Sequence, residues 1–476
     1  MAFRAHEHDL PGVALQQTAQ RRYPDGEIFA HIIGYEGLIK KDEYDAHKDA
    51  GYLLTDHIGK TGIEYQYEKY LHGTHGSKNA LVDSRGDVVK DLVDTAPVRG
   101  YDVHLNIDAE LQSFLTKRLA KECERAETRR AMAVVIDPRD GAVRALVSLP
   151  SYDNNAFAGG IDAATYSQLI NDPDRPLFHR AIAGLYAPGS TVKPVMGIAT
   201  LGENIVPADY QIESRGGITV GSFTFGDWRA HGFTDLRRAI AVSSDVYFYT
   251  VGGGYGNVAG LGIARMKEYM TRFGYGRLTG IDLPGESAGR YPDAQWKEEH
   301  IGEKWYVGNT YHASIGQGYV EATALQVAHA IVPIANGGTQ YVPHVVGRLV
   351  HPKTGEEIPI APQISTNDIA PQKDIRIVQE GMRQTVTDGT ATMLKSLPVA
   401  VAGKTGTAQF GTSDNVHSWF VSYAPYDNPE MVMVIMVEDQ TGTISSSTVP
   451  VAHDVYKWYY TDKNTDAFFA DTDSPQ

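Results

Sequence analysis

The segment YAPGSTVKPV holds a serine and a lysine three residues apart, Ser190 and Lys193, and no other serine of the chain has a lysine at that spacing. On a helix the two side chains share one face, about a turn apart, and Pro188-Gly189 marks a helix start. Unpaired N–H groups and the helix dipole there stabilise negative charge on the serine. The lysine amine can accept the hydroxyl proton if its pKa falls below about 10.4. The pair predicts a serine nucleophile with a lysine base, although a capping serine beside a surface lysine has the same spacing.

A second candidate element is the segment AVSSDVYFY, in which Ser243 and Asp245 lie two residues apart. On a loop or a strand this spacing directs both side chains to one side. A second serine there can relay a proton between a lysine and a departing amine. The same three residues before an aromatic run also fit a simple helix N-cap.

The tripeptide Lys-Thr-Gly occurs three times, in different surroundings. The copy at 60–62 precedes the helix-like run IEYQYEKYL. The copy at 353–355 lies in LVHPKTGEEI, where Pro and Gly predict a hairpin turn and two glutamates would repel an anionic substrate. The copy at 404–406 ends the strand-like VAVAG and continues into Thr407. A strand-edge lysine, two threonine hydroxyls and a glycine that admits a substrate backbone make this third copy the predicted carboxylate site.

The elements that position these motifs can be read from apolar spacing. Asp108 is placed to cap a helix whose apolar positions 111, 114, 115 and 119 share one face. The runs AMAVVID and AVRALVS, joined by PRDG, predict a hairpin. Further predicted elements are a helix at about 376–387, strands at VAVAG, SWFVSYA and MVMVIMV, and a last helix at about 452–460. This order predicts an α+β fold, in which helices flank an antiparallel sheet.

The first hundred residues differ in composition from the rest of the chain, since they are rich in Gly, Tyr and His. Glu27–Ile33 is β-like, whereas Glu64–Leu71 is typical of a helix. The change near Val103 predicts a boundary near residue 100, with one domain at 1–100 and a larger one at 101–476.

Composition excludes several function classes. The 476 residues carry a net charge of −15, and this argues against generic nucleic-acid binding because no bulk field attracts phosphate. The single cysteine, Cys123, cannot form an intrachain disulfide. No apolar run approaches the roughly 20 residues that span a bilayer.

Together, the three elements form an ordered set: SxxK, then SxD 53 residues later, then KTG 214 residues after the first. This order resembles the penicillin-recognising serine acyltransferases. YAPGSTVKPV, SSDVYFY, AGKTGTAQ and HSWFVSYAP are similar to the transpeptidase domain of class B penicillin-binding proteins, and GKTGIEYQYEKYL resembles their non-catalytic pedestal. Aspartate in SSD, followed by VYFY, is closer to the elongation-specific penicillin-binding protein 2 group than to the division-specific group.

The resemblance implies a peptidoglycan DD-transpeptidase that cross-links D-Ala-D-Ala stem peptides through an acyl-enzyme on Ser190 and is acylated by β-lactams. It implies a penicillin-binding transpeptidase fold, similar to serine β-lactamases, behind an N-terminal α+β pedestal. The catalytic residues it implies are Ser190, Lys193, Ser243 and Lys404, with backbone N–H groups of Ser190 and Thr407 forming the oxyanion hole. Substrate binding is expected from Asp245, Thr405, Gly406 and Thr407.

No cofactor and no metal is predicted. Some elongation enzymes of this family carry zinc just before the second motif, with a cysteine among its ligands. Here Asp227, His231 and Asp235 lie in that region, but Ile240 and Ala241 stand near the position of the cysteine. Three loosely spaced candidates do not establish a zinc site.

The resemblance also implies a place and a partner. The protein is expected at the extracytoplasmic, periplasmic face of the bacterial cytoplasmic membrane, with a single-pass anchor and the first pedestal strands missing from this chain. A SEDS-type membrane glycosyltransferase is the expected partner, received by the pedestal. The alternatives are a division-specific class B transpeptidase, a serine β-lactamase, and a β-lactam sensor or idle scaffold. The extra hundred residues argue against a β-lactamase, and the intact set of motifs argues against an idle scaffold.

Overall fold

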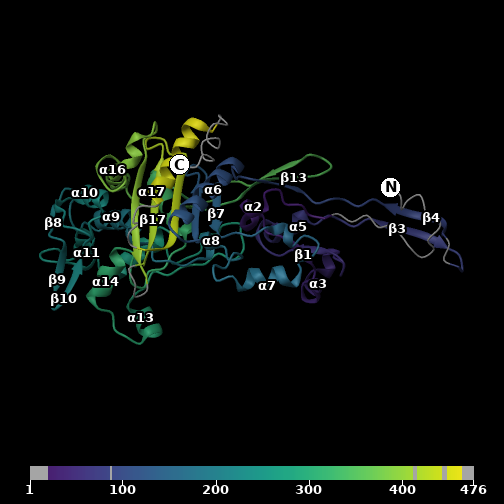
Figure 1. The fold of residues 1–476 in the computed structure, drawn as a ribbon, viewed down its shortest axis with the longest axis horizontal. Coiled ribbons are helices and arrows are strands. Elements are labelled where there is room, and N and C mark those ends of the chain that lie inside the picture. Colours follow the sequence, from purple (N-terminus) through teal and green to yellow (C-terminus); the bar gives the residue numbers. More distant parts are fainter. Residues whose placement is uncertain (1–19, 86–87, 411–414, 442–447, 464–476) are drawn as a thin grey trace.

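The computed structural model describes residues 20–85, 88–410, 415–441 and 448–463. The molecule is elongated (Figure 1): a sheet with helices lies near the middle, a helical lobe at one end, and a long two-stranded ribbon projects from the other end. No helix in these described stretches has both the length and the apolarity needed to cross a membrane.

The central element is a five-stranded sheet in the order β16-β17-β18-β6-β7, in which each neighbouring pair is antiparallel. Its strands are β16 (Ala402–Gln409), β17 (Asn415–Ala424), β18 (Met431–Thr441), β6 (Ala131–Ile136) and β7 (Val143–Leu149). The hairpin β6–β7 and the strands β17 and β18 confirm the sequence prediction. β16 begins at Ala402, later than VAVAG suggests, and runs through the whole Lys-Thr-Gly segment.

Helices cover both faces of this sheet, which is why its inner strands β18 and β6 contain nearly continuous apolar runs. In β6, residues 131, 133 and 135 join the cluster of α6 (Ala109–Arg125) and α17 (Thr448–Lys457), whereas 132, 134 and 136 join that of α15 (Ala324–Asn336). The predicted cap of α6 is present, since Asp108 accepts the Leu111 N–H at 3.1 Å. The predicted α+β class is therefore present, with helices flanking an antiparallel sheet.

The helical lobe packs against the β16 side of the sheet. It contains α9 (Lys193–Gly202), α10 (Leu236–Val242), α11 (Asp245–Gly253), α12 (Gly262–Arg272), α13 (Ala294–Ile301), α14 (Val307–Ser314) and α16 (Gln372–Asp388). Two short ribbons lie at its far end, β8 (Ile212–Ser214) with β11 (Gly232–Thr234), and β9 (Gly217–Val220) with β10 (Phe223–Gly226). Helix α16 contacts both α10 and β16, so it joins the lobe to the sheet edge.

The part that precedes residue 100, here called the pedestal, is small and mixed. Its elements are α2 (Gly26–Ile33), β1 (Glu36–Leu38), α3 (Lys41–His47), β2 (His57–Gly59), α4 (Gly62–Gln66), α5 (Glu68–Leu71), β3 (Ser77–Val82) and β4 (Val88–Thr95). Strands β3 and β4 form the projecting ribbon (Figure 1). The chain then enters β5 (Asp102–Leu105), which pairs with β13 (Val346–Val350). The boundary near residue 100 stays a prediction.

One prediction for the pedestal is wrong. The β-like segment Glu27–Ile33 is helical, as α2. Its Ile and Phe favour a strand locally, but the helix buries Ala30 and Ile32 completely, and it contacts α4, α6 and β7. Tertiary packing therefore outweighs the local preference, as it does for β-propensity in general. The helix expected at Glu64–Leu71 is present as α4 and α5.

Candidate active site

The first motif lies on a tight turn. Gly189–Val192 forms one turn of 3-10 helix, and α9 starts only at Lys193, so the α-helix begins later than Pro188-Gly189 suggests. Gly189 has φ +55°, and a Cβ there would lie 2.9 Å from the carbonyl oxygen of Thr407. Glycine is therefore required, because the turn lies directly against β16. This places half-buried Ser190 beside the sheet edge.

The side chain of Lys193 is fully buried and points to the second motif. Its Nζ donates to the carbonyl oxygen of Ser243 at 2.8 Å and lies 3.2 Å from Ser243 Oγ. The Asp245 carboxylate is 2.5 Å away, where it can stabilise the positive charge that forms when the buried amine takes up a proton. The first two motifs, about fifty residues apart, thus meet at one amine.

The second motif occupies the junction between α10 and α11. Ser243 ends α10 in a left-handed conformation, φ +60° and ψ +39°, which costs a non-glycine residue about 1–2 kcal/mol. Ser244 then caps α11, and its Oγ accepts the Tyr247 N–H at 3.4 Å. The helix cap and the proton-relay geometry are therefore both present, on neighbouring serines. The strained backbone turns the Ser243 side chain and carbonyl toward Lys193.

Asp227 stabilises the junction between α10 and α11 by accepting hydrogen bonds from it. Its side chain is fully buried, and its Oδ2 accepts hydrogen bonds from Ser244 Oγ at 3.0 Å, Ser214 Oγ at 3.2 Å and the Val246 N–H at 3.1 Å. From the sequence, Asp227 is predicted only as a possible metal ligand, because nothing local indicates that an aspartate 16 residues upstream braces the SSD turn. The structure shows it as a positioning residue for the second motif.

The third motif lies on β16, the edge strand of the sheet. Lys404 is fully buried, and its Nζ donates to the carbonyl oxygen of Thr405 at 2.8 Å. Burial lowers the Lys404 pKa well below its usual value; the Lys193 charge lowers it further, and Asp245 partly opposes this. Thr405 Oγ1 shares a 2.7 Å hydrogen bond with Thr390, and Thr407 is exposed.

The turn that carries Ser190 and the strand that carries the Lys-Thr-Gly segment are in contact. A Cβ on Gly406 would lie 2.9 Å from Thr191 Cγ2, so glycine allows this close approach. The structure therefore brings the three motifs together, with their predicted site residues Ser190, Lys193, Ser243, Asp245, Lys404, Thr405, Gly406 and Thr407.

The other two Lys-Thr-Gly copies differ from the third. Lys60 forms a 2.5 Å ion pair with Glu43 of the pedestal, and Gly62 starts α4. Residues 353–355 lie in the turn between β13 and β14 (Glu357–Pro359), which is the predicted hairpin. The first copy therefore lies in the pedestal and the second in an exposed turn, whereas the third lies on β16 against the Ser190 turn.

The residues considered for zinc do not fit a metal. His231 Nε2 lies 3.4 Å from Asp227 Oδ1, but the other Asp227 oxygen is occupied by three hydrogen bonds. Asp235 instead caps α10 by accepting the Arg238 N–H at 2.8 Å. Among the described residues, these three do not gather into a set of potential metal ligands. Two candidates fall short of the four ligands that zinc prefers, and the absence of a metal here stays a prediction.

Comparison with known families gives two matches along the chain. Residues 131–457 match the family described as the penicillin binding protein transpeptidase domain. Residues 1–105 match the penicillin-binding protein dimerisation domain.

Individual relatives agree with the family matches. The chain is 36% identical to the peptidoglycan D,D-transpeptidase MrdA of Haemophilus influenzae, over 96% of this chain and 72% of the relative. It is 34% identical to MrdA of Escherichia coli K12, over 92% and 71%. Pseudomonas aeruginosa PBP2, solved in complex with WCK 5153, superposes with a TM-score of 0.78 at 33% identity, covering 94% of this chain and 93% of that one. Helicobacter pylori PBP2, solved in complex with MreC, superposes with a TM-score of 0.79 at 30% identity, covering 93% and 80%.

Proposed function

The chain belongs to the penicillin-binding protein transpeptidase family, and from that premise we propose how each residue of the site serves the reaction. The protein is a serine-type D-Ala-D-Ala transpeptidase of peptidoglycan, related to the elongation-specific enzymes. The observation that carries the residue assignment is the position of Lys193 Nζ, which lies 3.2 Å from Ser243 Oγ and at the start of α9, directly after the 3-10 turn that holds Ser190.

In the first step, Ser190 Oγ attacks the carbonyl between the two terminal D-alanines, and Lys193 accepts its proton. The developing oxyanion is held by the backbone N–H groups of Ser190 and Thr407, a type of donor worth about 3–4 kcal/mol each in other enzymes. The contact between the Ser190 turn and β16 supports this pairing.

In the second step the C–N bond breaks. The leaving D-alanine nitrogen takes a proton from Ser243 Oγ, and Lys404 then donates a proton that restores the Ser243 hydroxyl. A lowered Lys404 pKa favours such a transfer, because an ordinary ammonium would hold its proton too firmly. An amine from a neighbouring strand then attacks the ester to give a cross-link, or water attacks it to give a shortened peptide. The attacking group gives up a proton, which restores Lys404 through Ser243, and Lys193 returns its proton to Ser190 Oγ as the ester bond breaks.

The terminal carboxylate of the stem peptide is bound at β16. The Lys404 charge attracts it, while the Thr405 and Thr407 hydroxyls donate hydrogen bonds to it. Gly406 leaves room for the substrate backbone to lie along the edge strand. The Asp245 carboxylate holds Lys193 in place through their 2.5 Å ion pair. Its negative charge also offsets the positive charges of the two lysines near the substrate.

The reaction is tested with a synthetic pentapeptide ending in D-Ala-D-Ala and a separate acceptor amine. We expect one D-alanine to be released for each cross-linked or shortened product. With penicillin in place of the pentapeptide, we expect an ester on the enzyme that hydrolyses slowly. Steady penicillin hydrolysis without D-alanine release would instead support a β-lactamase, and absence of any acylation would support a scaffold.

Relatives of this chain assemble with other proteins. A Helicobacter pylori PBP2 is solved with MreC, and another similar chain comes from a peptidoglycan synthase complex that couples polymerization and crosslinking. We infer that this pedestal likewise receives a membrane glycan polymerase, a SEDS-type glycosyltransferase, outside the cytoplasmic membrane where the substrate lies. Support comes from the projecting β3–β4 ribbon, whose exposed apolar side chains are Leu81, Val82, Val89 and Leu92.

The partner role is tested in a membrane-tethered form of the protein. Deleting residues 1–100 should spare penicillin acylation if the remainder folds, and replacing Leu81 and Leu92 by serine should leave acylation intact. Both changes should abolish co-purification with the polymerase. Normal polymerase binding by the deleted form would show that the pedestal has no such role.

A further inference from the structure

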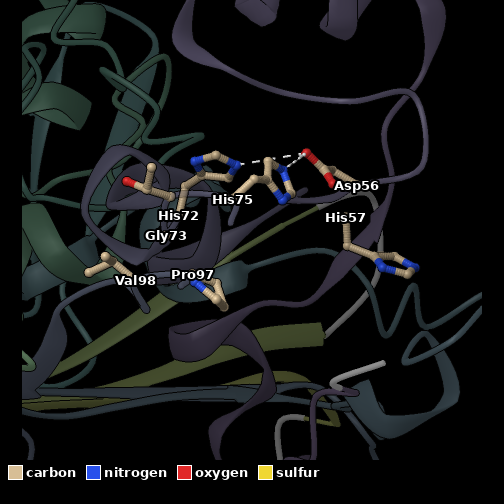
Figure 2. A pocket seen from close by; sticks show the side chains of 8 residues that line it. Asp56, His57, His72, Gly73, His75, Pro97 and Val98 are labelled. Atoms are coloured by element: carbon tan, nitrogen blue, oxygen red, sulfur yellow. Dashed lines mark hydrogen bonds and ion pairs between the residues drawn. The ribbon is translucent and has the colours of Figure 1, made fainter. Parts of the chain in front are cut away.

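Two histidines and an aspartate converge in the pedestal, outside the candidate active site. Asp56, His72 and His75 face one another in Figure 2, and one ligand atom from each lies within 4.8 Å of the other two. They come from three separate places: the turn before β2, the end of α5, and the root of the β3–β4 ribbon. Neither the transpeptidase chemistry nor the proposed partner surface accounts for this cluster.

Asp56 and His72 are held in place by their neighbours. Asp56 Oδ2 accepts the Leu53 N–H at 2.8 Å within a tight turn. The His72 ring stacks on Tyr52 with centroids 3.8 Å apart, and the Tyr52 hydroxyl donates to Glu68 at 2.8 Å. Supports of this kind orient ligands before a metal binds.

The distances suit a small transition-metal ion. Asp56 Oδ2 lies 2.8 Å from His75 Nε2 and 3.9 Å from His72 Nε2. Zinc takes imidazole nitrogen and carboxylate oxygen at about 2.0–2.2 Å in tetrahedral sites, which places neighbouring donors roughly 3.3–3.5 Å apart. The observed separations bracket this value, so small rotations of the His72 and His75 rings would close the site.

We propose that Asp56, His72 and His75 bind one divalent transition-metal ion of the zinc type. Two imidazoles and a carboxylate favour such an ion over magnesium or calcium, which prefer all-oxygen ligands. A cavity of about 260 Å³ adjoins the three residues and leaves the fourth coordination position to water.

The metal would brace the root of the ribbon. His75 lies just before β3, where Thr74 and Val98 exchange two backbone hydrogen bonds of 2.7 and 2.9 Å that close the ribbon base. Asp56 and His72 belong to the compact part of the pedestal. An ion shared between them and His75 therefore restricts how the ribbon is directed from the pedestal.

The metal itself, added as zinc chloride to chelator-stripped full chain, is the probe. A competition titration against a chromogenic chelator should find one tight equivalent, and His72→Ala, His75→Ala and Asp56→Ala should each weaken it at least about 100-fold, beyond the 10–100-fold typical of losing a supporting residue. His57→Ala is the matched control, because His57 lines the same cavity but its ring points away from the cluster (Figure 2). His231→Ala controls for the region near the SSD motif.

Anomalous diffraction at the zinc edge locates the ion in the unaltered protein, independently of how the variants fold. A peak between Asp56, His72 and His75 supports the proposal. The proposal would be overturned if no zinc bound or if the peak lay elsewhere. It would also be overturned if tight zinc binding survived the double His72→Ala/His75→Ala change and was lost in His231→Ala. Penicillin acylation is measured in parallel, so failure of the metal site and failure of the proposed enzyme chemistry are separate outcomes.

Discussion

The Nζ of Lys193 lies 2.8 Å from the carbonyl oxygen of Ser243, a residue fifty positions further along the chain. This contact depends on the left-handed conformation of Ser243, which turns its carbonyl and its hydroxyl to the same amine. Lys193, three residues after Ser190, thus connects the first motif to the serine of the second.

Replacing each Lys-Thr-Gly lysine by alanine should separate the three copies. Lys404→Ala should slow acylation by a fluorescent penicillin at least about 100-fold, the scale of losing one partner of a buried charged interaction. Lys60→Ala removes only the pedestal ion pair to Glu43, and Lys353→Ala changes an exposed turn, so both should stay within about two-fold. A loss for Lys353→Ala comparable with that for Lys404→Ala would show that the substrate carboxylate is bound elsewhere.

Burial of Lys404 should lower the free energy of unfolding of the protein. The Lys404 pKa is lowered in the folded state, so the unfolded chain holds the proton more tightly, and the cost is complete at pH values below the folded pKa. The cost fades as the pH rises toward the unfolded value of about 10.4. Lys404→Met, which keeps the side-chain length, should therefore melt about 1–3 °C higher at pH 7. Calorimetry across pH tests this, and a lower melting temperature for the variant would contradict it.

Asp245→Asn should change the pH dependence of acylation. The negative charge of Asp245 raises the Lys404 pKa, against the larger lowering by burial. Removing that charge should lower the Lys404 pKa further. If charged Lys404 holds the substrate carboxylate, the alkaline fall in acylation rate should therefore move to lower pH. A fall that stays in place or moves to higher pH would show that Asp245 does not act on Lys404.

Asp227→Ala should impair catalysis without contact to substrate. The change leaves two serine hydroxyls and one N–H without their buried acceptor, at about 1–3 kcal/mol for each group left unsatisfied. We expect a lower melting temperature and an acylation rate constant roughly 10- to 100-fold smaller at unchanged penicillin affinity. Asp227→Asn keeps an acceptor oxygen and should recover most of the rate. Equal rates in wild type and Asp227→Ala would limit Asp227 to a structural role.

Much of this architecture could be predicted from local sequence signals. Asp108 and the apolar positions after it specify α6, and the ordered motifs single out Ser190 and Lys404 because their spacing is unusual as a set. The signals fail where the determining contact is distant. Helix α2 is stabilised by packing that no local pattern records, and the role of Asp227 depends on a fold that brings it under the SSD turn.

The same limit applies to the strained residue and to the pedestal cluster. A left-handed Ser243 cannot be read from its residue type, since serine ordinarily avoids that conformation. Asp56 stands 16 and 19 residues before the two histidines, spacings that correspond to no periodic element. Only the return of the chain from α5 to the ribbon root brings the three together.

The most direct test of the central claim is to locate the covalent bond formed with penicillin. The intact chain and Ser190→Ala are incubated with a fluorescent penicillin, digested, and analysed by mass spectrometry. The account predicts one adduct per chain, on the peptide that contains YAPGSTVKPV, with the mass on Ser190, and no adduct in the Ser190→Ala protein. Stoichiometric labelling of Ser190→Ala, or an adduct mapped to Ser243 or any other residue in the intact chain, would contradict it.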